Sequence, residues 1–215
     1  MDITCVSDLH GHYPELEGGD LLIVAGDLTA LDILAQLLGF FRWIRRQRYR
    51  KKVVVGGNHD NLLDKGVPLT VLEEIECVCS YLCDSGTEFE GMKIWGSPWT
   101  RTFEGMNPHC KAFTLDTEDA LAKKFELIPA DVDILVTHSP PFTILDMTED
   151  GRQVGSTALM AQHAGRLRPK LWVFGHIHDS HGTAGPYEWN NTKYVNASHM
   201  DARYAPVNTP IRVIL

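Results

Sequence analysis

The sequence predicts an α/β fold with a mixed, rather than purely parallel, β-sheet system. Short apolar or β-branched runs recur along the 215 residues, and stretches of helical length separate several of them. In the second half the runs follow one another with few helices between them, which is typical of mixed sheets. The length, with 44% hydrophobic and 22% charged residues, indicates a single globular domain over residues 1–215.

Eight runs have the length and composition of strands. They cover residues 3–6, 21–25, 52–55, 93–96, 133–137, 171–174, 193–197 and 211–215. Helices are predicted over 30–48, 117–126 and 156–166, and the second has Thr117 as a suitable cap followed by acids in its first turn. The segment 97–116 has no periodicity, so we expect a functional or flexible loop there.

The charge distribution argues against a surface built for broad nucleic-acid binding. The net charge is -8, although the segment "RWIRRQRYRKK" at 42–52 is strongly basic. Because it follows the apolar run "LDILAQLLGFF", we interpret it as the solvated end of an amphipathic helix, where basic residues complement the helix dipole. A binding patch for a nucleic acid is the alternative.

Compartment and membrane association are also constrained by the sequence. The N-terminus has no apolar run of signal-peptide length, and no charge-free stretch is long enough to cross a bilayer. A cytoplasmic protein without membrane contact is therefore expected. Five cysteines, an odd number without a C-x-x-C zinc spacing, predict reduced structural thiols.

Asp, Asn and His residues follow five of the predicted strands, in the motifs "SDLH", "GDLT", "GGNHD", "THSPP" and "GHIH". In open α/β sheets ligands collect beyond the carboxyl ends of the strands, so these side chains should surround one crevice. The candidate site residues are Asp8, His10, Asp27, Asn58, His59, His138, His176 and His178.

This set of donors favours a metal centre. Mixed oxygen and imidazole ligands suit Mn, Fe or Zn better than Ca, and their number fits two ions that share a carboxylate. Each short motif alone is typical of an ordinary polar turn, whereas the ordered set of five is specific. Gly26, Gly56, Gly57 and Gly175 stand where the chain must turn tightly and let a ligand approach.

The ordered motifs resemble those of the calcineurin-like metallophosphoesterase superfamily: D-x-H, G-D, G-N-H-D/E, a lone H and G-H-x-H. The stretches "GMKIWGSPWT", "DILVTHSPP", "GRQVG", "PKLWVFGHIH" and "VNAS" resemble its small single-domain branch, which includes metallophosphoesterase-domain-containing brain proteins and bacterial relatives. This resemblance implies a fold of two mixed sheets packed as a sandwich and flanked by helices.

The resemblance also implies a role for each site residue. A first metal would be held by Asp8, His10 and His178, and a second by Asn58, His138 and His176. Asp27 would bridge both ions. His59 would act on the leaving-group oxygen without holding metal, and Asp60 would orient it.

The expected activity is hydrolysis of phosphodiesters with two divalent ions, Mn being favoured and Fe or Zn the alternatives. Two cations about 3.5 to 4 Å apart can acidify a bridging water into a hydroxide that attacks phosphorus. We expect a cyclic nucleotide or another small diester as substrate, because the net charge is acidic and no added domain is apparent. A single-strand nuclease, and a catalytically idle member that binds a nucleotide or a partner, are the alternatives. The oligomeric state stays open.

Several other polar and aromatic residues have more ordinary interpretations. His12, His109, His181 and His199 are expected at the surface or the rim of the site, and Arg152 at the surface, with phosphate contact as the alternative for His12 and Arg152. Core or rim packing is expected of Trp95, Trp99, Trp172 and Trp189, and Trp99 is the one to test for base stacking.

Overall fold

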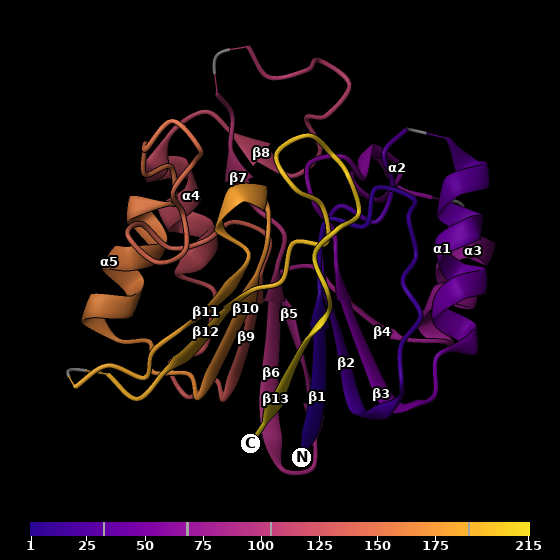
Figure 1. The fold of residues 1–215 in the computed structure, drawn as a ribbon, viewed down its shortest axis with the longest axis horizontal. Coiled ribbons are helices and arrows are strands. Elements are labelled where there is room, and N and C mark those ends of the chain that lie inside the picture. The colour runs from indigo at the N-terminus through magenta and orange to yellow at the C-terminus, as the bar shows by residue number, and fades with distance from the viewer. Residues whose placement is uncertain (32, 68, 104, 189) are drawn as a thin grey trace.

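The computed structural model of the protein describes residues 1–31, 33–67, 69–103, 105–188 and 190–215, so Trp189 lies outside the described residues. Four layers follow one another across the molecule: helices, a first sheet, a second sheet and further helices (Figure 1). This arrangement confirms the α/β class and the two-sheet sandwich flanked by helices.

The first sheet has five strands in the order β13-β1-β2-β3-β4. Strands β1 to β4 are parallel to their neighbours, and β13 pairs with β1 in the antiparallel direction. The bounds are β1 Asp2–Val6, β2 Gly19–Ala25, β3 Tyr49–Val55, β4 Ser80–Leu82 and β13 Ile211–Ile214. Four of them coincide with predicted runs, whereas the three-residue β4 was not predicted.

The second sheet has six strands in the order β11-β12-β10-β9-β6-β5. Its four inner strands are parallel to one another. Each of the two edge strands is antiparallel to its own neighbour, β11 to β12 and β5 to β6. The bounds are β5 Ser85–Phe89, β6 Met92–Ser97, β9 Ile134–Thr137, β10 Leu171–Phe174, β11 Gly182–Ala184 and β12 Lys193–Asn196. The edge strands β5 and β11 were missed because they lack a sustained apolar run.

The alternation of side chains along the strands divides the hydrophobic core into three parts. Leu21 and Ile23 of β2 belong to the cluster between the sheets, together with Leu171 and Val173 of β10. The intervening residues of β2 pack with the helices outside the first sheet, and those of β10 with the helices outside the second. Both faces of these strands are therefore buried, as their continuous apolar sequences require.

Five α-helices lie in the described part of the chain, and four of them form the outer layers (Figure 1). Helices α1 and α3 cover the first sheet, whereas α4 and α5 cover the second. Thr117 and Ser156 cap α4 and α5 by accepting a hydrogen bond from a backbone N–H in the first turn. The bounds are α1 Leu34–Arg46, α2 Asn61–Lys65, α3 Leu69–Glu76, α4 Glu118–Phe125 and α5 Thr157–Gly165.

Helix α1 is shorter than the predicted 30–48, a range that includes the undescribed residue 32. The amide side chain of Gln36 accepts hydrogen bonds from the backbone N–H groups of Ala30 and Leu31, which holds this stretch in a turn before the helix. The helix ends at Arg46 because Gln47 is already extended and the chain enters β3 at Tyr49.

The segment 97–116, predicted as irregular, contains two short strands. Strands β7 (Thr100–Arg101) and β8 (Thr114–Leu115) pair in the parallel direction beside the sandwich. Two residues are too few to give a periodic signal in the sequence. No helix among the described residues has the length and apolar character needed to cross a membrane.

Candidate metal centre

The carboxyl ends of five parallel strands place their following loops at one edge of the sandwich. The loops after β1, β2 and β3 come from the first sheet, and those after β9 and β10 come from the second. All eight residues predicted from the strand ends meet there. Three overlapping groups have ligand atoms within 4.8 Å of one another: Asp8 with His10 and His178, His10 with Asp27 and His59, and Asp27 with His138 and His176.

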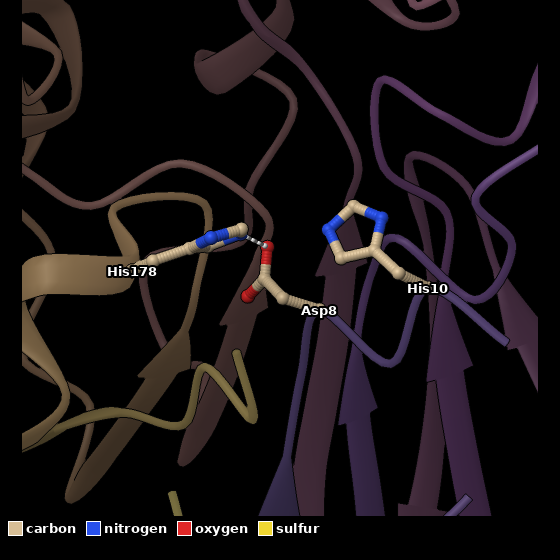
Figure 2. Close-up of side chains that lie close together, drawn as sticks. All are labelled: Asp8, His10 and His178. Atoms are coloured by element: carbon tan, nitrogen blue, oxygen red, sulfur yellow. Dashed lines mark ion pairs between the residues drawn. The ribbon is translucent and has the colours of Figure 1, made fainter. Parts of the chain in front are cut away.

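Asp8 lies between His10 and His178 in the first group (Figure 2). Its carboxylate accepts hydrogen bonds from the hydroxyl of Ser198 at 2.8 Å and from the backbone N–H of His176 at 3.0 Å. His178 approaches it with Nε2, 3.4 Å from Oδ1. These contacts fix the carboxylate before any ligand binds, which is the role of outer hydrogen bonds around a metal.

Asp27 lies between the two outer groups. Its Oδ2 is 3.6 Å from Nε2 of His10, and its Oδ1 is 3.5 Å from Nε2 of His138. The backbone N–H of His59 donates to Oδ1 at 2.9 Å and orients the carboxylate. Each oxygen of this one carboxylate thus faces a different set of imidazoles.

Hydrogen bonds define which ring nitrogen of two histidines faces the centre. Nδ1 of His138 lies 2.9 Å from the backbone carbonyl of Ala25, and Nδ1 of His178 lies 3.1 Å from that of Asp201. A carbonyl can only accept, so Nδ1 carries the proton in both rings and Nε2 is directed into the centre. Asn58 adjoins the group of Asp27, His138 and His176, since its Oδ1 is 3.0 Å from Nε2 of His138.

His10 provides a test of whether these residues fit a metal. Both of its ring nitrogens are buried without a hydrogen-bond partner among the described residues, although buried polar atoms are almost always satisfied. Its Nε2 faces Asp27 at 3.6 Å, too long for a hydrogen bond. A cation between them would satisfy both groups, so the donor set fits a divalent metal.

The backbone at the centre is strained. Asp8, His10, Asp27 and His176 all have positive φ, at 53°, 43°, 52° and 69°. Such a conformation is uncommon outside glycine and persists where the surroundings enforce it, often at functional sites. All four residues lie in the loops that directly follow β1, β2 and β10.

Two glycines are required by the crowding around these carboxylates. A Cβ atom at Gly175 would collide with the carboxylate of Asp8 and the side chain of Ser7, and one at Gly57 would collide with Asp27 and the ring of His138. The predicted reason for these glycines, close approach of the chain to the centre, agrees with this geometry.

Burial and neighbouring charges shift the pKa values of the donors in different directions. Burial lowers the pKa of His10 to about 4 and that of His176 to about 3, which leaves both rings neutral near pH 7. Burial also opposes the charge on His138, but the charge of Asp27 outweighs it and raises the pKa of that ring to about 9. The charge on His138, in turn, outweighs burial and holds the pKa of Asp27 well below its usual range.

His59 stands beside the centre, and its ring is contacted from the segment 97–116. Its Nδ1 lies 3.3 Å from Sγ of Cys110, and its Nε2 lies 4.0 Å from Oδ2 of Asp27. The side chain is 13% exposed, so it borders both the buried donors and the solvent. Cys110, like the other four cysteines, forms no disulfide, in agreement with the predicted thiols.

The structure corrects the predicted role of Asp60. Its buried carboxylate accepts hydrogen bonds from the backbone N–H groups of Gly57, Leu28 and Thr29 and from the Thr29 hydroxyl, at 2.9 to 3.1 Å. It therefore ties the loop after β2 to the loop after β3 and does not orient the His59 ring. Burial, and then the charge of Asp27, raises the pKa of Asp60 to about 7.

The tryptophan, arginine and histidine residues expected to pack or to lie at the surface make contacts outside the proposed metal sites. Trp99 donates to Asp84 at 2.8 Å and has the Lys124 ammonium 4.0 Å from its ring centroid, so it is a packing residue. Arg152 pairs with Asp150 at the surface, and His12 is exposed. His109 is exposed as well. The rings of the remaining two of these histidines bond to backbone carbonyls, His181 to that of Thr209 and His199 to that of Asn208.

Sequence reasoning missed the contribution of the segment 198–208, which follows β12. Ser198 bonds to Asp8, the carbonyl of Asp201 bonds to His178, and the ring of Tyr204 lies 5.0 Å from that of His10. Ser198 directly follows the predicted run 193–197, but a serine there is not a ligand motif. Asp201 and Tyr204 lie further along the chain, so the strand-end pattern gave no signal for them.

Comparisons with known proteins agree with this arrangement. The family model described as calcineurin-like phosphoesterase matches residues 1–180. The chain is 35% identical to human Metallophosphoesterase domain-containing protein 1 over 99% of its own length and 70% of that protein. It is 30% identical to UPF0046 protein T07D4.2 of Caenorhabditis elegans over 97% of its length and 58% of that protein. The crystal structure of TT1561 of Thermus thermophilus shares the fold, with a TM-score of 0.59 and 17% identity over 99% of this chain and 97% of that one.

The fold, the ordered motifs and these matches place the chain in one class. It belongs to the calcineurin-like phosphoesterase family. Membership implies a metal-dependent hydrolase of phosphate esters, and the cluster of Asp and His side chains supplies candidate ligands for the metal.

Proposed function

We propose that the protein is a phosphodiesterase with two divalent metal sites. Asp8, His10 and His178 form one site, and a second is formed by Asn58, His138 and His176. The observation that carries this proposal is the position of Asp27, whose two oxygens face His10 at 3.6 Å and His138 at 3.5 Å. A carboxylate with that placement is suited to bridge two cations.

The donor set supports manganese as the metal, with iron or zinc as alternatives. Carboxylate, amide and imidazole donors are mixed, and no thiolate is present among the proposed ligands. When bound, the ions would supply Lewis-acid polarisation of the phosphate oxygens and would lower the pKa of a water molecule enough to make it a nucleophile. The residues of the chain contribute binding, orientation and proton transfer around that chemistry.

His59 is proposed to act on the leaving group. Its Nδ1 faces the thiol of Cys110, which leaves Nε2 turned toward the centre, 4.0 Å from Asp27. A protonated Nε2 there can donate to the oxygen that departs from phosphorus. The backbone N–H of His59 also orients Asp27. The loop after β3 therefore carries the proposed proton donor and, by this hydrogen bond, positions the proposed bridging carboxylate.

A small diester, such as a cyclic nucleotide, is the proposed substrate class. The basic segment 42–52, which would support a nuclease, runs from the end of α1 into the start of β3. Because β3 ends at the centre, this segment begins at the opposite edge of the sheet. A nucleic acid bound at the centre would therefore not be bound by this basic segment as well, and the geometry favours a small substrate.

The test is metal analysis combined with a substrate panel. Elemental analysis should give two manganese ions per chain for the wild type and a loss at both sites for Asp27→Asn, which keeps the volume but removes the bridging charge. The panel comprises cyclic nucleotides, aryl diesters, aryl monoesters and single-stranded DNA. Two tightly bound ions in Asp27→Asn would refute the bridging role, and a wild type that hydrolyses none of the panel would favour an idle, binding member.

Reversing the charges of the exposed arginines Arg45, Arg46 and Arg48 tests the nuclease alternative. Hydrolysis of a cyclic nucleotide should stay within a few-fold of the wild type and vary little with salt, because only one phosphate is contacted. A nuclease would instead show a log–log salt slope of roughly 0.7 per contacted phosphate. Preferential cleavage of DNA, with a salt slope that the charge reversal removes, would establish the nuclease.

A further inference from the structure

Tyr204 occupies an unusual position for an exposed aromatic residue. It is 54% exposed, yet its ring centroid lies 4.9 Å from that of His178 and 5.0 Å from that of His10. The ring of His59 is 6.3 Å away. One side chain therefore contacts two proposed metal ligands and stands next to the residue proposed to act on the leaving group, while part of its surface remains open to solvent.

The backbone holds Tyr204 in this place at a conformational cost. Its φ of 59° is rare for a bulky residue. Asp201 stabilises the turn: its carboxylate accepts hydrogen bonds from the backbone N–H groups of Arg203 at 2.9 Å and Ala205 at 2.8 Å, and its carbonyl accepts from that of Tyr204 at 2.9 Å. The same carbonyl faces Nδ1 of His178 at 3.1 Å, so the turn is tied directly to the centre.

We propose that Tyr204 is a specificity-determining residue whose ring forms a wall for a flat organic group on the leaving side of the phosphate ester. The leaving side is assigned because the ring adjoins His59. Packing is the proposed interaction because Tyr204 is a large aromatic residue that is 54% exposed beside the centre. The inference rests on the proposed function, which it deepens by naming the kind of ester that the site selects.

The competing explanation is that Tyr204 only shields His10 and His178 from water. A shield would be replaced adequately by any large apolar side chain, and its loss would affect metal binding. A packing wall requires an aromatic ring, and its loss would affect only ligands that carry a flat group. Tyr204→Phe, Tyr204→Leu and Tyr204→Ala separate these explanations, and Val207→Ala is the control, since Val207 is exposed at 62% in the same segment.

The first measurement is binding, which does not depend on turnover. Calorimetric titrations of the manganese-loaded protein with phenylphosphonate and methylphosphonate should show about a tenfold preference for the phenyl compound, in line with the usual worth of an aromatic contact. Tyr204→Phe and Val207→Ala should keep the preference. Tyr204→Leu and Tyr204→Ala should lose it while their metal content and their affinity for methylphosphonate stay unchanged.

The second measurement is hydrolysis of two diesters whose leaving groups have similar acidity, methyl phenyl phosphate and methyl hexafluoroisopropyl phosphate. The ratio of their kcat/KM values should fall about tenfold in Tyr204→Ala, because only the phenyl leaving group can pack on the ring. An unchanged ratio, or equal weakening of both phosphonates with loss of metal, would overturn the role of Tyr204 and leave the proposed function intact. A wild type that hydrolyses neither diester but shows a Tyr204-dependent preference for phenylphosphonate would refute the proposed function and support the packing role of the Tyr204 ring.

Discussion

Metal binding to this centre should release a proton from His138. Both nitrogens of its ring face oxygen acceptors: Nδ1 lies 2.9 Å from the carbonyl of Ala25, and Nε2 lies 3.0 Å from Oδ1 of Asn58. Burial opposes a charge on the ring, but the carboxylate of Asp27 outweighs burial and raises the pKa to about 9. A metal ligand must present a lone pair, so the proton on Nε2 has to leave when the ion binds.

The size of the effect follows from that pKa. At pH 7 the ring is about two units below a pKa of about 9, and each unit corresponds to about 1.4 kcal/mol. Deprotonation therefore costs about 3 kcal/mol, which lowers the apparent metal affinity about 100-fold at pH 7. His10 and His176, with pKa values lowered to about 4 and 3 by burial, are already neutral and release nothing.

Metal affinity and the stability of the apoprotein should depend on pH in opposite directions. Because the folded-state pKa of His138 is raised, its pairing with Asp27 stabilises the apoprotein below about pH 6.5, and this stabilisation is lost as the pH rises through about 9. Metal affinity should instead rise by about tenfold for each pH unit between 6.5 and 8.

Calorimetric titration with Mn²⁺ in two buffers of different ionisation enthalpy measures the proton count directly. We expect about one proton from His138 at pH 7, with a further release from His178, the other proposed ligand whose pKa is raised. His138→Gln should bind less metal and release correspondingly fewer protons. Binding of two ions with no buffer-dependent heat, and with the same affinity at pH 6.5 and 8, would show that His138 is not protonated in the apoprotein.

Three further outcomes are expected. His59→Ala should retain both ions and lower kcat by about 10²- to 10⁴-fold, with a smaller loss for nitrophenolate leaving groups, and equal losses for good and poor leaving groups would contradict its role as an acid. Ser198→Ala removes a 2.8 Å hydrogen bond to Asp8 and should weaken one metal site about 10- to 100-fold. Ser97→Ala removes a similar 2.9 Å bond to Asp84, which is not a proposed ligand, and should not weaken it. Chelation of the metal should lower Tm, by several degrees if about 3 kcal/mol of binding energy is lost, and a Tm independent of chelator would argue against tight binding.

The candidate ligands could be predicted because their positions depend on local sequence and a general rule. Each follows a strand that is visible as an apolar run, and the carboxyl ends of parallel strands share one edge of a sheet. Asp8, Asp27 and Asn58 follow three neighbouring strands, β1, β2 and β3. The same rule predicted that the histidines would join them, but the arrangement of the strands in two packed sheets was implied only by the family resemblance.

Other parts of the centre depend on contacts that have no local signature. The placement of Tyr204 requires a turn with positive φ that is held by Asp201, three residues earlier. Cys110 reaches His59 from a segment without periodicity, 51 residues along the chain. Asp60 illustrates the opposite error, because its place next to His59 suggested a partnership, whereas its carboxylate is occupied by the backbone of the loop after β2.

The position of the centre across both sheets explains why strain is tolerated there. Residues in the left-handed conformation cost about 1 to 3 kcal/mol each and persist only when their surroundings over-determine them. The strands that carry them are buried on both faces, and the cluster between the sheets reaches Ala25, Val55 and Val136, at or next to the last residues of β2, β3 and β9. Asp27 of the first sheet and His138 of the second meet directly above this layer, with oxygen and nitrogen 3.5 Å apart. The spacing of the donors is therefore set by how closely the two sheets pack, and a cavity in the layer beneath them would disturb metal affinity even where the fold survives.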